Sequence, residues 1–420
     1  MMDLVVTVVG LGYVGLPLAS EICKTENKVY GFDLSNDVIR GLDSGKSHID
    51  DLSDEDVASM YSSGFEATTN TECISLSDVV VICVPTPLMG DGSPNMEMII
   101  EASRTVASSM KPSSLVILES TTYPGTTDGT VLNLLEEISG LKAGSEFFLA
   151  YSPERIDPGN PDFGIRNTPK IVAGYTENCK ERVVAFYGEF IEKVEPVSGL
   201  KEAEMAKLLE NTYRHINIAL VNEMAIFCHE LDIDLWEVIR AAKTKPFGFE
   251  AFYPGPGVGG HCIPIDPNYL SWLVQSLGYE FRFVELAKEI SNHMPDYVSS
   301  RIKESLEKEG KTVAGANILI LGVSYKANSS DQRETPARPL AEALIGSGAN
   351  LRFFDPFVNF FVVGDDRFET IESLEGASDW ADLFVLLQPH RGIIDNKHLD
   401  TAKKIFDTRG VLTGQNVEKL

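Results

Sequence analysis

Residues 4–15 read Leu4-Val5-Val6-Thr7-Val8-Val9-Gly10-Leu11-Gly12-Tyr13-Val14-Gly15. The β-branched run up to Val9 is typical of a buried parallel strand, and residues 12–24 have the pattern of a helix. The G-x-G-x-x-G between them allows a tight turn and lets a pyrophosphate approach the main chain at the helix N-terminus. The stretch therefore predicts the first strand–turn–helix unit of a dinucleotide-binding domain.

A second strand pattern, over residues 28–33, ends in the acidic residue Asp33. In dinucleotide-binding domains an acid about 20 residues after the glycines bonds the ribose hydroxyls. Because its charge would repel a 2′-phosphate, Asp33 favours NAD over NADP. The alternative is a glycine turn that holds no ligand, but strand, glycines, helix, strand and acid together favour NAD binding.

Buried-strand patterns recur along the first half of the chain, at residues 79–84, 114–119, 147–150 and 170–174. Helical patterns lie between most of them. An alternation of strands and helices implies a doubly wound parallel sheet.

The pattern changes near residue 198. Residues 201–231 have apolar side chains at helical spacing and no Gly or Pro, which predicts one long helix. Strand patterns return at residues 316–322, 350–355 and 381–387. We therefore expect an α/β fold in which two Rossmann-like, doubly wound parallel-sheet domains are joined by a helical domain with a long central helix. The expected boundaries are 1–196, 197–307 and 308–420.

The composition of the chain argues against some classes of binding partner and indicates a cellular compartment. The 420 residues carry a formal net charge of −26, which argues against nucleic acid and against an anionic membrane surface. The six cysteines show no CxxC pair and no metal-type spacing with histidine. The apolar run at residues 4–9 is too short to span a bilayer. A globular protein of a reducing cytoplasm fits these features best.

Polar residues follow two of the predicted strands where these end. Pro85 and Thr86 follow the strand at 79–84, and Ser120 and Thr121 follow the next strand. Ligands of open α/β sheets bind at the carboxyl ends of parallel strands, so these hydroxyls are candidates to contact a cofactor or a substrate. Alternatively, each segment is a turn with capping hydroxyls.

Two further polar sets are candidates for catalysis. Glu154, in a turn-rich segment that it shares with Arg155, could position a water or accept a proton; the alternative is a solvated salt bridge in a loop. Lys207 and Asn211 are four residues apart and share one helix face. Both can donate hydrogen bonds to an oxygen that gains negative charge. The alternative is an ordinary polar face, which the neighbouring Glu204 would fit.

Cys262 follows four glycines within eight residues, at 255, 257, 259 and 260. Asp266 and two prolines follow it and fix the loop. A thiolate can hold an aldehyde while a hydride leaves it, which is a specific pairing with a predicted nicotinamide site. The alternative is a buried structural thiol. The adjacent His261 could act as a base, but neighbours in sequence often point apart.

A series of motifs occurs in one order along the chain: Gly10-Leu11-Gly12-Tyr13-Val14-Gly15, Pro85-Thr86-Pro87, Ser120-Thr121, Ser152-Pro153-Glu154-Arg155, Lys207 to Asn211, Gly259-Gly260-His261-Cys262 and Lys326 to Arg333. Together they resemble the UDP-glucose/GDP-mannose dehydrogenase family over essentially the whole chain. The resemblance implies an NAD domain at 1–196, a helical dimerisation domain at 197–307 and a UDP-sugar-binding domain at 308–420. It also implies a homodimer, or a higher assembly of dimers, built on the long helix.

The reaction implied by the resemblance is the oxidation of a sugar CH₂OH to a carboxylate with two NAD. Cys262 would hold the carbon as a thiohemiacetal and then as a thioester. Lys207 and Asn211 would stabilise the alkoxide and the later oxyanions. Asp266, with Thr121 and an ordered water, would handle protons, and Glu154 would assist hydrolysis of the thioester.

The resemblance also assigns binding residues. Those expected to contact NAD are Gly10, Gly12, Tyr13, Val14, Gly15, Asp33, Pro85, Thr86, Ser120, Thr121 and Arg333. Those expected to contact the substrate are Glu154, Arg155, Lys207, Asn211, Tyr253, Gly257, Gly259, Tyr325 and Lys326. No metal is expected.

Three segments are most similar to enzymes that act on UDP-N-acetylhexosamines, especially UDP-N-acetylglucosamine: residues 152–160, 246–249 and 252–257. UDP-glucose enzymes usually carry Lys three positions after the cysteine, where this chain has Ile265. The third domain departs from the family pattern at Ala327 and Ser330, usually Pro and an acid. UDP-N-acetylmannosamine, UDP-N-acetylgalactosamine and UDP-glucose are the alternative substrates.

Two readings from other classes stay open at this point. One is a non-catalytic, NAD-dependent sensor or scaffold, which loss of Cys262, Lys207 or Asn211 would favour, although all three are present. The other is a two-electron dehydrogenase of 3-hydroxy acids, against which the third α/β segment and Cys262 argue.

Overall fold

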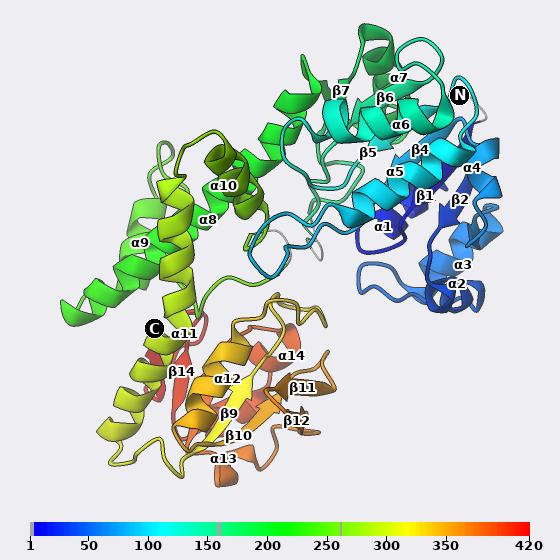
Figure 1. Cartoon of the computed structure of the whole chain (residues 1–420). Coiled ribbons are helices and arrows are strands. Elements are labelled where there is room, and N and C mark those ends of the chain that lie inside the picture. Colours follow the sequence, from blue (N-terminus) through cyan, green and yellow to red (C-terminus); the bar gives the residue numbers. More distant parts are fainter. Residues whose placement is uncertain (1–3, 158–159, 161, 261–262) are drawn as a thin grey trace. The chain divides into compact units, whose positions relative to one another are not determined.

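The computed structural model describes residues 4–157, 160, 162–260 and 263–420 (Figure 1). The chain forms two compact units. One comprises Met1–Glu210 with Asn268–Ser276, and the other comprises Asn211–Pro267 with Leu277–Leu420. The boundary between them falls inside helix α8 (Leu200–Glu230), which belongs to both.

The first unit is built on one sheet. Its strands are β1 (Val5–Val9), β2 (Lys28–Phe32), β3 (Glu66–Thr68), β4 (Val79–Ile82), β5 (Leu115–Leu118), β6 (Phe148–Tyr151), β7 (Lys170–Gly174) and β8 (Val194–Pro196). Their order across the sheet is β3-β2-β1-β4-β5-β6-β7-β8. The change of direction at β1 and β4 is the switch point at which doubly wound sheets bind ligands.

The predicted doubly wound parallel sheet is confirmed, with one antiparallel pair of strands that the sequence did not indicate. β6 and β7 pair antiparallel, while β7 and β8 are parallel. A short apolar run indicates a buried strand but carries no information about its direction. Parallel neighbours need a crossover, usually a helix, whereas the chain between β6 and β7 has no helix among its described residues.

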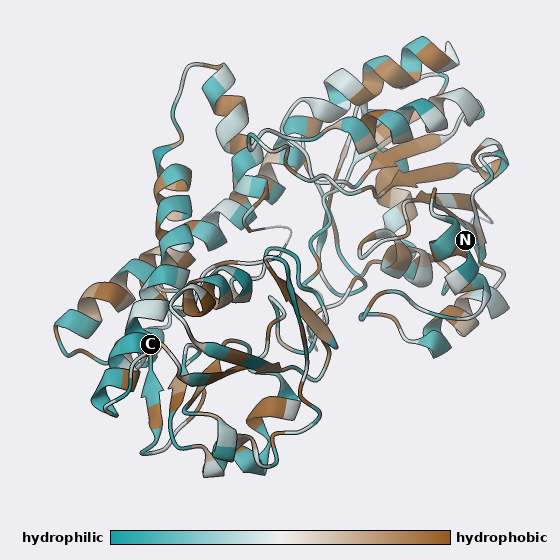
Figure 2. Ribbon diagram, turned by 60° about the horizontal axis from the view of Figure 1, so that its bottom comes forward, coloured by the Kyte–Doolittle hydropathy of each residue, from teal (hydrophilic) through white to brown (hydrophobic). Residues whose placement is uncertain are grey.

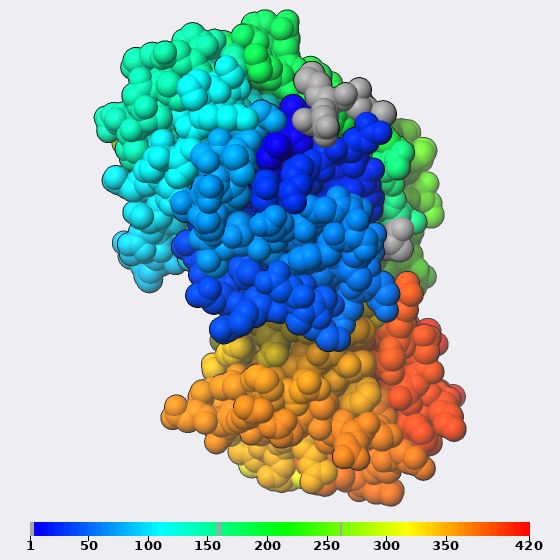
Figure 3. Space-filling model, turned by 90° about the vertical axis from the view of Figure 1, so that its right-hand side faces the viewer, coloured from blue at the N-terminus to red at the C-terminus, as the bar shows by residue number. Residues whose placement is uncertain are grey.

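The helices of this unit lie on both faces of the sheet. They are α1 (Gly15–Ile22), α2 (Asn36–Asp43), α3 (Asp54–Ser62), α4 (Glu72–Leu76), α5 (Glu97–Ser109), the π-helix η1 (Thr126–Val131), α6 (Leu132–Ser139), α7 (Glu177–Tyr187) and the start of α8. Most of α10 (Asp266–Ser276) also belongs to this unit. In Figure 3 the blue segments that include α2 and α3 form a closely packed surface. α1 begins three residues later than the predicted start because residues 12–14 belong to the turn.

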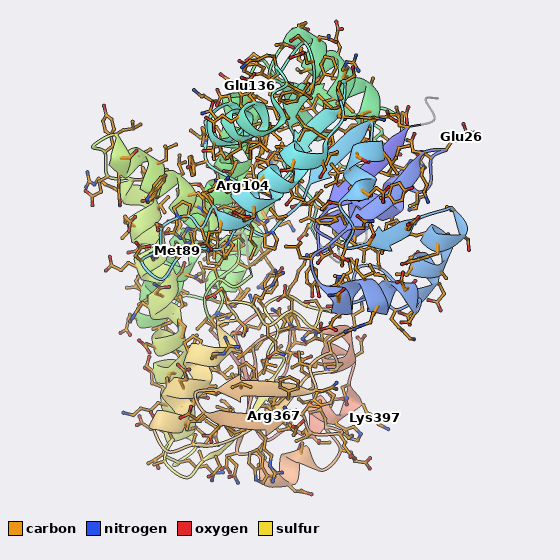
Figure 4. The ribbon with its side chains drawn as sticks, turned by 45° about the vertical axis from the view of Figure 1, so that its right-hand side comes forward. Glu26, Met89, Arg104, Glu136, Arg367 and Lys397 are labelled. Atoms are coloured by element: carbon orange, nitrogen blue, oxygen red, sulfur yellow. The ribbon has the colours of Figure 1, made fainter. Side chains whose placement is uncertain are left out.

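Alternate residues of each central strand enter two different cores. Val79 and Val81 of β4 pack with α1 and α7, whereas Val80 and Ile82 pack with α5 and α6. Because side chains alternate between the two faces, both faces of the sheet are buried, and central strands such as β4 and β5 consist only of apolar residues, which Figure 2 colours brown. In Figure 4, Arg104 and Glu136 mark α5 and α6, the helices over one of these faces.

The second unit contains a parallel five-stranded sheet in the order β10-β9-β13-β14-β15. Its strands are β9 (Asn317–Leu321), β10 (Asn350–Phe354), β13 (Leu383–Leu386), β14 (Ile405–Asp407) and β15 (Val417–Lys419), and a separate antiparallel hairpin consists of β11 (Phe360–Val363) and β12 (Asp366–Glu369). Arg367, labelled in Figure 4, lies on this hairpin.

The helices of the second unit are α9 (Leu235–Lys243), α11 (Arg282–Lys308), α12 (Ala337–Gly346), α13 (Ala377–Trp380), α14 (Arg391–Ile394), the 3₁₀-helix η2 (Lys397–Thr401) and the remainder of α8. Ile318 and Ile320 of β9 pack with α11 and α12, while Leu319 and Leu321 pack with α13 and α14. The predicted second α/β segment and the predicted long helix are therefore confirmed.

Two further features bear on the composition. Among the described residues, no helix is long and apolar enough to cross a membrane. The five cysteines in the described part of the chain, Cys23, Cys73, Cys83, Cys179 and Cys228, are all buried and free.

Candidate active site

The three glycines of the first turn differ in what surrounds them. A Cβ built on Gly10 would lie 2.7 Å from the Cys83 carbonyl oxygen, and one on Gly15 would lie 1.9 Å from the Gly10 carbonyl oxygen. A Cβ on Gly12 would meet no heavy atom of the described residues within 4 Å. The chain's own packing therefore requires glycine at 10 and 15. The free space above Gly12 fits the approach of a pyrophosphate to the main chain.

Asp33 lies directly after β2 and holds the glycine turn. Its Oδ2 accepts a hydrogen bond from Leu11 N at 2.9 Å, and its Oδ1 accepts one from Ser35 N at 2.8 Å. Each carboxylate oxygen can accept more than one hydrogen bond, so ribose hydroxyls can also be bound. The next side chain, Leu34, is 80% exposed and offers an apolar surface beside the turn. Tyr13 and Val14 pack against the core below.

The polar segments after β4 and β5 are held by the sheet. Ser120 Oγ donates to Val84 O at 2.8 Å, and both Ser120 and Thr86 are buried. Thr121 is partly buried and Pro85 is exposed. Tyr269, on α10 in the same unit, donates from its hydroxyl to Thr86 O at 3.0 Å. The two predicted strand-end segments therefore lie at the carboxyl edge of neighbouring strands, where the sheet can bind a ligand.

Glu154 and Lys207 are a nearly buried pair in the first unit. Lys207 Nζ donates to Glu154 O at 2.5 Å and lies 3.3 Å from Glu154 Oε2. One helical turn later, Glu210 accepts a hydrogen bond from Arg155 Nη2 at 2.6 Å. The loop after β6 is therefore connected to α8 by two ionic contacts, and Lys207 is a positive charge with little access to water.

Asn211 and Asp266 are the corresponding pair in the second unit. Asn211 Nδ2 donates to Asp266 Oδ2 at 2.5 Å, and both residues are buried. Asp266 is the first residue of α10 and closes the loop that carries Cys262. Cys262 and its neighbour His261 lie outside the described residues, so the prediction for Cys262 stays a prediction.

The glycine-rich loop before Cys262 is fixed by hydrogen bonds within the second unit. Gly255 N donates to Asn222 Oδ1 at 2.9 Å, and Gly260 N donates to Arg333 O at 3.0 Å. Gly257 has a φ of +132°, which disfavours other residues. A Cβ on Gly259 would lie 2.7 Å from Tyr325 Cβ, so the backbone of the loop packs directly against the side chain of Tyr325.

The remaining predicted residues of the second unit have their own partners. The Arg333 guanidinium makes hydrogen bonds of 2.6–3.0 Å to Asp331. Tyr253 is exposed and stacks on Trp236, with 6.1 Å between the ring centroids. Lys326 accepts a hydrogen bond at its carbonyl oxygen from Ser324 Oγ at 2.8 Å. These contacts place all three in ordered segments.

Sequence reasoning missed Arg409, which follows β14. A Cβ on Gly255 would lie 2.9 Å from Arg409 Nη1, so the guanidinium lies against the glycine-rich loop. Its Nε donates to Leu387 O at 2.7 Å, while its two terminal nitrogens have no hydrogen-bond partner among the described residues. Burial lowers the pKa of Arg409 to about 10, so the group keeps its charge at neutral pH. It is a candidate to bind an anion.

The site residues thus form two groups, one in each unit. The first unit brings together the glycine turn, Asp33, the strand-end hydroxyls and the Glu154–Lys207 pair. The second brings together the Asn211–Asp266 pair, the glycine-rich loop and Arg409. The glycine turn with Asp33 fits NAD. Among the described residues, no group of three or more His, Cys, Asp or Glu side chains is arranged to hold a metal ion.

Comparison with known proteins identifies the family. The chain matches three domains of the UDP-glucose/GDP-mannose dehydrogenase family: the NAD binding domain at residues 4–191, the central domain at 201–293 and the UDP binding domain at 319–414.

Relatives cover most of the chain. It is 38% identical to the UDP-N-acetyl-D-glucosamine 6-dehydrogenase of Pseudomonas aeruginosa, over 86% of this chain and 84% of the relative. It is 35% identical to the UDP-N-acetyl-D-mannosamine dehydrogenase of Pyrococcus horikoshii, over 99% and 96%. The solved structure of a UDP-D-ManNAc dehydrogenase from Pyrococcus horikoshii superposes with a TM-score of 0.89 and 32% identity, covering 99% of this chain and 98% of that one. The chain therefore belongs to the UDP-glucose/GDP-mannose dehydrogenase family and is an NAD-dependent nucleotide-sugar dehydrogenase of the UDP-hexosamine type.

Proposed function

We propose that this enzyme oxidises the C6 hydroxymethyl group of a UDP-N-acetylhexosamine to a carboxylate, with UDP-N-acetylglucosamine as the preferred substrate. The balanced reaction consumes one sugar nucleotide, two NAD and one water, and it yields the uronate, two NADH and three protons. The observation that carries the proposal is the pair of buried hydrogen-bond donors on α8, Lys207 and Asn211, each held by a carboxyl group.

The proposed roles follow from the chemistry of these groups. When bound, NAD accepts a hydride from the substrate carbon in each of the two oxidations. Lys207 and Asn211 donate hydrogen bonds to the substrate oxygen as it gains negative charge. The Cys262 thiolate adds to the aldehyde carbon, so that carbon stays bound as a thiohemiacetal and, after the second oxidation, as a thioester.

Proton transfer and hydrolysis fall to the carboxyl groups. Asp266, with Thr121 and a water, takes the proton from the substrate hydroxyl. Glu154 positions the water that attacks the thioester, which releases the carboxylate and regenerates the Cys262 thiol. Low exposure supports both roles, because a carboxyl group with little access to bulk water exchanges protons mainly with the groups beside it.

The nucleotide end is proposed to bind in the second unit. Domains at 1–196, 197–307 and 308–420 are proposed for NAD, for the helical core and for the UDP moiety. We assign Tyr325, Lys326 and Arg409 to the UDP-sugar, because they lie beside the glycine-rich loop or in the segment that packs on it. Arg333 is assigned to NAD, as the family resemblance implies.

We propose UDP-N-acetylglucosamine rather than UDP-N-acetylmannosamine as the substrate because of three sequence segments. Relatives named for either sugar have similar identity, at 38% and 35%. The segments at 152–160, 246–249 and 252–257 support an N-acetylglucosamine substrate, and Ile265 counts against UDP-glucose. Turnover of each sugar nucleotide is therefore the decisive comparison.

A homodimer through α8 is part of the proposal. Large apolar side chains on this helix are exposed: Met205, Leu209, Tyr213, Leu220 and Phe227. Their spacing of four and seven residues places them along one stripe of the helix. A solvent-facing apolar stripe of this length is typical of an interface. Sedimentation of the purified protein tests this part directly.

The function is tested with UDP-glucose, UDP-N-acetylglucosamine, UDP-N-acetylmannosamine and UDP-N-acetylgalactosamine, with NADH and uronate both quantified. We expect two NADH per uronate and the highest kcat/KM with UDP-N-acetylglucosamine. One NADH per product, or no turnover of any of the four, would contradict the proposal.

The mechanism is tested with Cys262→Ser, for which we expect a fall in kcat on the order of 10³ or more. Cys228→Ser, a change at a buried cysteine of the second unit, is the matched control and is expected to keep its kcat. A Cys262→Ser enzyme that completes both oxidations at the wild-type rate would exclude the thioester route.

A further inference from the structure

The segment after β5 carries Ser120 and Thr121 and is held at its start by the sheet. Ser120 donates from both its backbone N and its Oγ to carbonyl oxygens at the end of β4. The chain then leaves the sheet and turns at Gly125, whose φ is +98°, into η1. The position of Thr121 therefore depends on what holds the far end of this turn.

Glu204 of α8 holds that far end. Its carboxyl group accepts hydrogen bonds from Gly125 N at 2.7 Å, from Thr127 N at 2.9 Å and from Thr127 Oγ1 at 2.7 Å. Both Glu204 and Thr127 are 0% exposed. A buried carboxylate with three donors from one turn is a strong and geometrically specific contact.

The next two turns of α8 hold the neighbouring loop. Lys207 contacts Glu154 and Glu210 contacts Arg155, both in the loop after β6. Residues 204, 207 and 210 are three apart and lie along one side of the helix. Through them, the loop after β5 and the loop after β6 are attached to the same rigid element.

We propose that Glu204 is a positioning residue for the reaction proposed above: it fixes the turn at 125–127, and with it Ser120 and Thr121, in a set place relative to Lys207 and Glu154. The inference rests on the proposed function, since it assigns Thr121 and Lys207 to the same chemistry. Glu204 itself touches neither the reacting atoms nor the cofactor in this assignment.

The charge state of Glu204 gives the contact a pH dependence. Burial, together with the negative charge of Asp128, raises the pKa of Glu204 to about 7. The three hydrogen bonds to its carboxyl group lower the pKa, but their effect is smaller than that of burial. Asp128 faces Glu204 from η1, and its Oδ2 lies 3.5 Å from Lys201 of α8. Protonation turns one of the two carboxylate oxygens that accept these three hydrogen bonds into a donor, so the turn is held more firmly above pH 7 than below it.

The experiment compares wild type with Glu204→Gln, Thr127→Val and Thr127→Ser. Glu204→Gln keeps the shape but loses acceptors, and we expect kcat to fall roughly 10- to 100-fold with a smaller change in the KM for NAD. Thr127→Val removes one hydrogen bond of the three and is expected to be intermediate, while Thr127→Ser keeps the hydroxyl and is expected to restore kcat. Glu181→Gln, at an exposed position of α7, is the control and should match wild type.

Two readouts separate positioning from a loss of folded protein. NAD titration counts intact sites, so kcat is expressed per site. The pH profile of kcat should lose its inflection near pH 7 in Glu204→Gln. Wild-type kcat and an unchanged pH profile in Glu204→Gln would overturn the inference, and so would a fall in kcat fully explained by fewer NAD sites.

Hydrogen exchange of the peptide covering residues 120–131 distinguishes this inference from the proposed function. If wild type turns over no sugar nucleotide, the proposed function fails, and exchange still reports whether Glu204 holds the turn. Faster exchange in Glu204→Gln than in Glu181→Gln supports the inference. Equal exchange in the two variants overturns it, whatever the activity.

Discussion

The glycine turn allows one chemical change, Gly→Ala, to separate folding from cofactor binding. At Gly15 the added methyl would lie 1.9 Å from the Gly10 carbonyl oxygen, and at Gly10 it would meet the Cys83 oxygen at 2.7 Å and require a φ of +92°. Overpacking and a left-handed backbone each cost on the order of 1–3 kcal/mol. Gly10→Ala incurs both costs, and Gly15→Ala incurs overpacking alone at a much shorter contact, so we expect each variant to lose about 3 kcal/mol. Gly12 has neither problem.

For Gly12→Ala we expect a change in unfolding free energy within about 1 kcal/mol. The same methyl occupies the space proposed for the pyrophosphate. Losing a hydrogen bond to a charged group costs about 1.5–3 kcal/mol, which corresponds to roughly 10- to 100-fold weaker NAD binding. Gly12→Ala should therefore melt like wild type and bind NAD poorly.

The assay is thermal denaturation without ligand, followed by NAD titration monitored by intrinsic fluorescence. At about 2–4 °C per kcal/mol for a unit of this size, Gly10→Ala and Gly15→Ala should melt roughly 6–12 °C below wild type. The reasoning is refuted if Gly12→Ala melts as early as Gly15→Ala. It is also refuted if Gly12→Ala binds NAD with wild-type affinity.

Two further predictions concern single side chains of the second unit. Burial, and to a lesser extent the charge of Lys288, lowers the pKa of His215 from its ordinary 6.5 to about 4. Between pH 6.5 and pH 4 the unfolded chain therefore binds a proton at His215 that the folded chain does not. The free energy of unfolding consequently falls as the pH drops from 6.5 towards 4. The loss of unfolding free energy amounts to up to about 3 kcal/mol. In urea unfolding at pH 7 and pH 4.5, His215→Gln should show a much smaller difference between the two pH values than wild type. Arg409→Lys should raise the KM for the UDP-sugar about tenfold or more, since an ammonium cannot replace the planar fork, and should leave the Kd for NAD unchanged; an unchanged KM would remove Arg409 from the site.

The longer strands of both sheets could be predicted because their signals are local. A β-branched run followed by glycines and a helix pattern is sufficient for β1 and α1, and the absence of Gly and Pro from residues 201–231 is sufficient for α8. The antiparallel step between β6 and β7 could not be predicted, because a buried run of four or five residues has the same composition in either direction.

The site was only partly predictable for a related reason. Glu204 fits an ordinary polar helix face, since a charged residue at a helix position gives no sign of its burial. Only the fold shows that three donors from a distant turn surround it. Arg409 was missed because the strand before it, Ile405–Asp407, has only three residues and gives too weak a signal to mark a strand end.

Helix α8 sets one distance in the site independently of how the two compact units are arranged. The unit boundary falls between Glu210 and Asn211, so Lys207 and Asn211 belong to different units. Both lie on a helix that is continuous from Leu200 to Glu230, and four residues of helix rise about 6 Å. The two proposed oxyanion donors are therefore kept one turn apart by the hydrogen bonds of the helix itself. A Gly or Pro between them would be far more damaging than the same change near the end of α8, because it would alter the spacing of the donors as well as the stability of the helix.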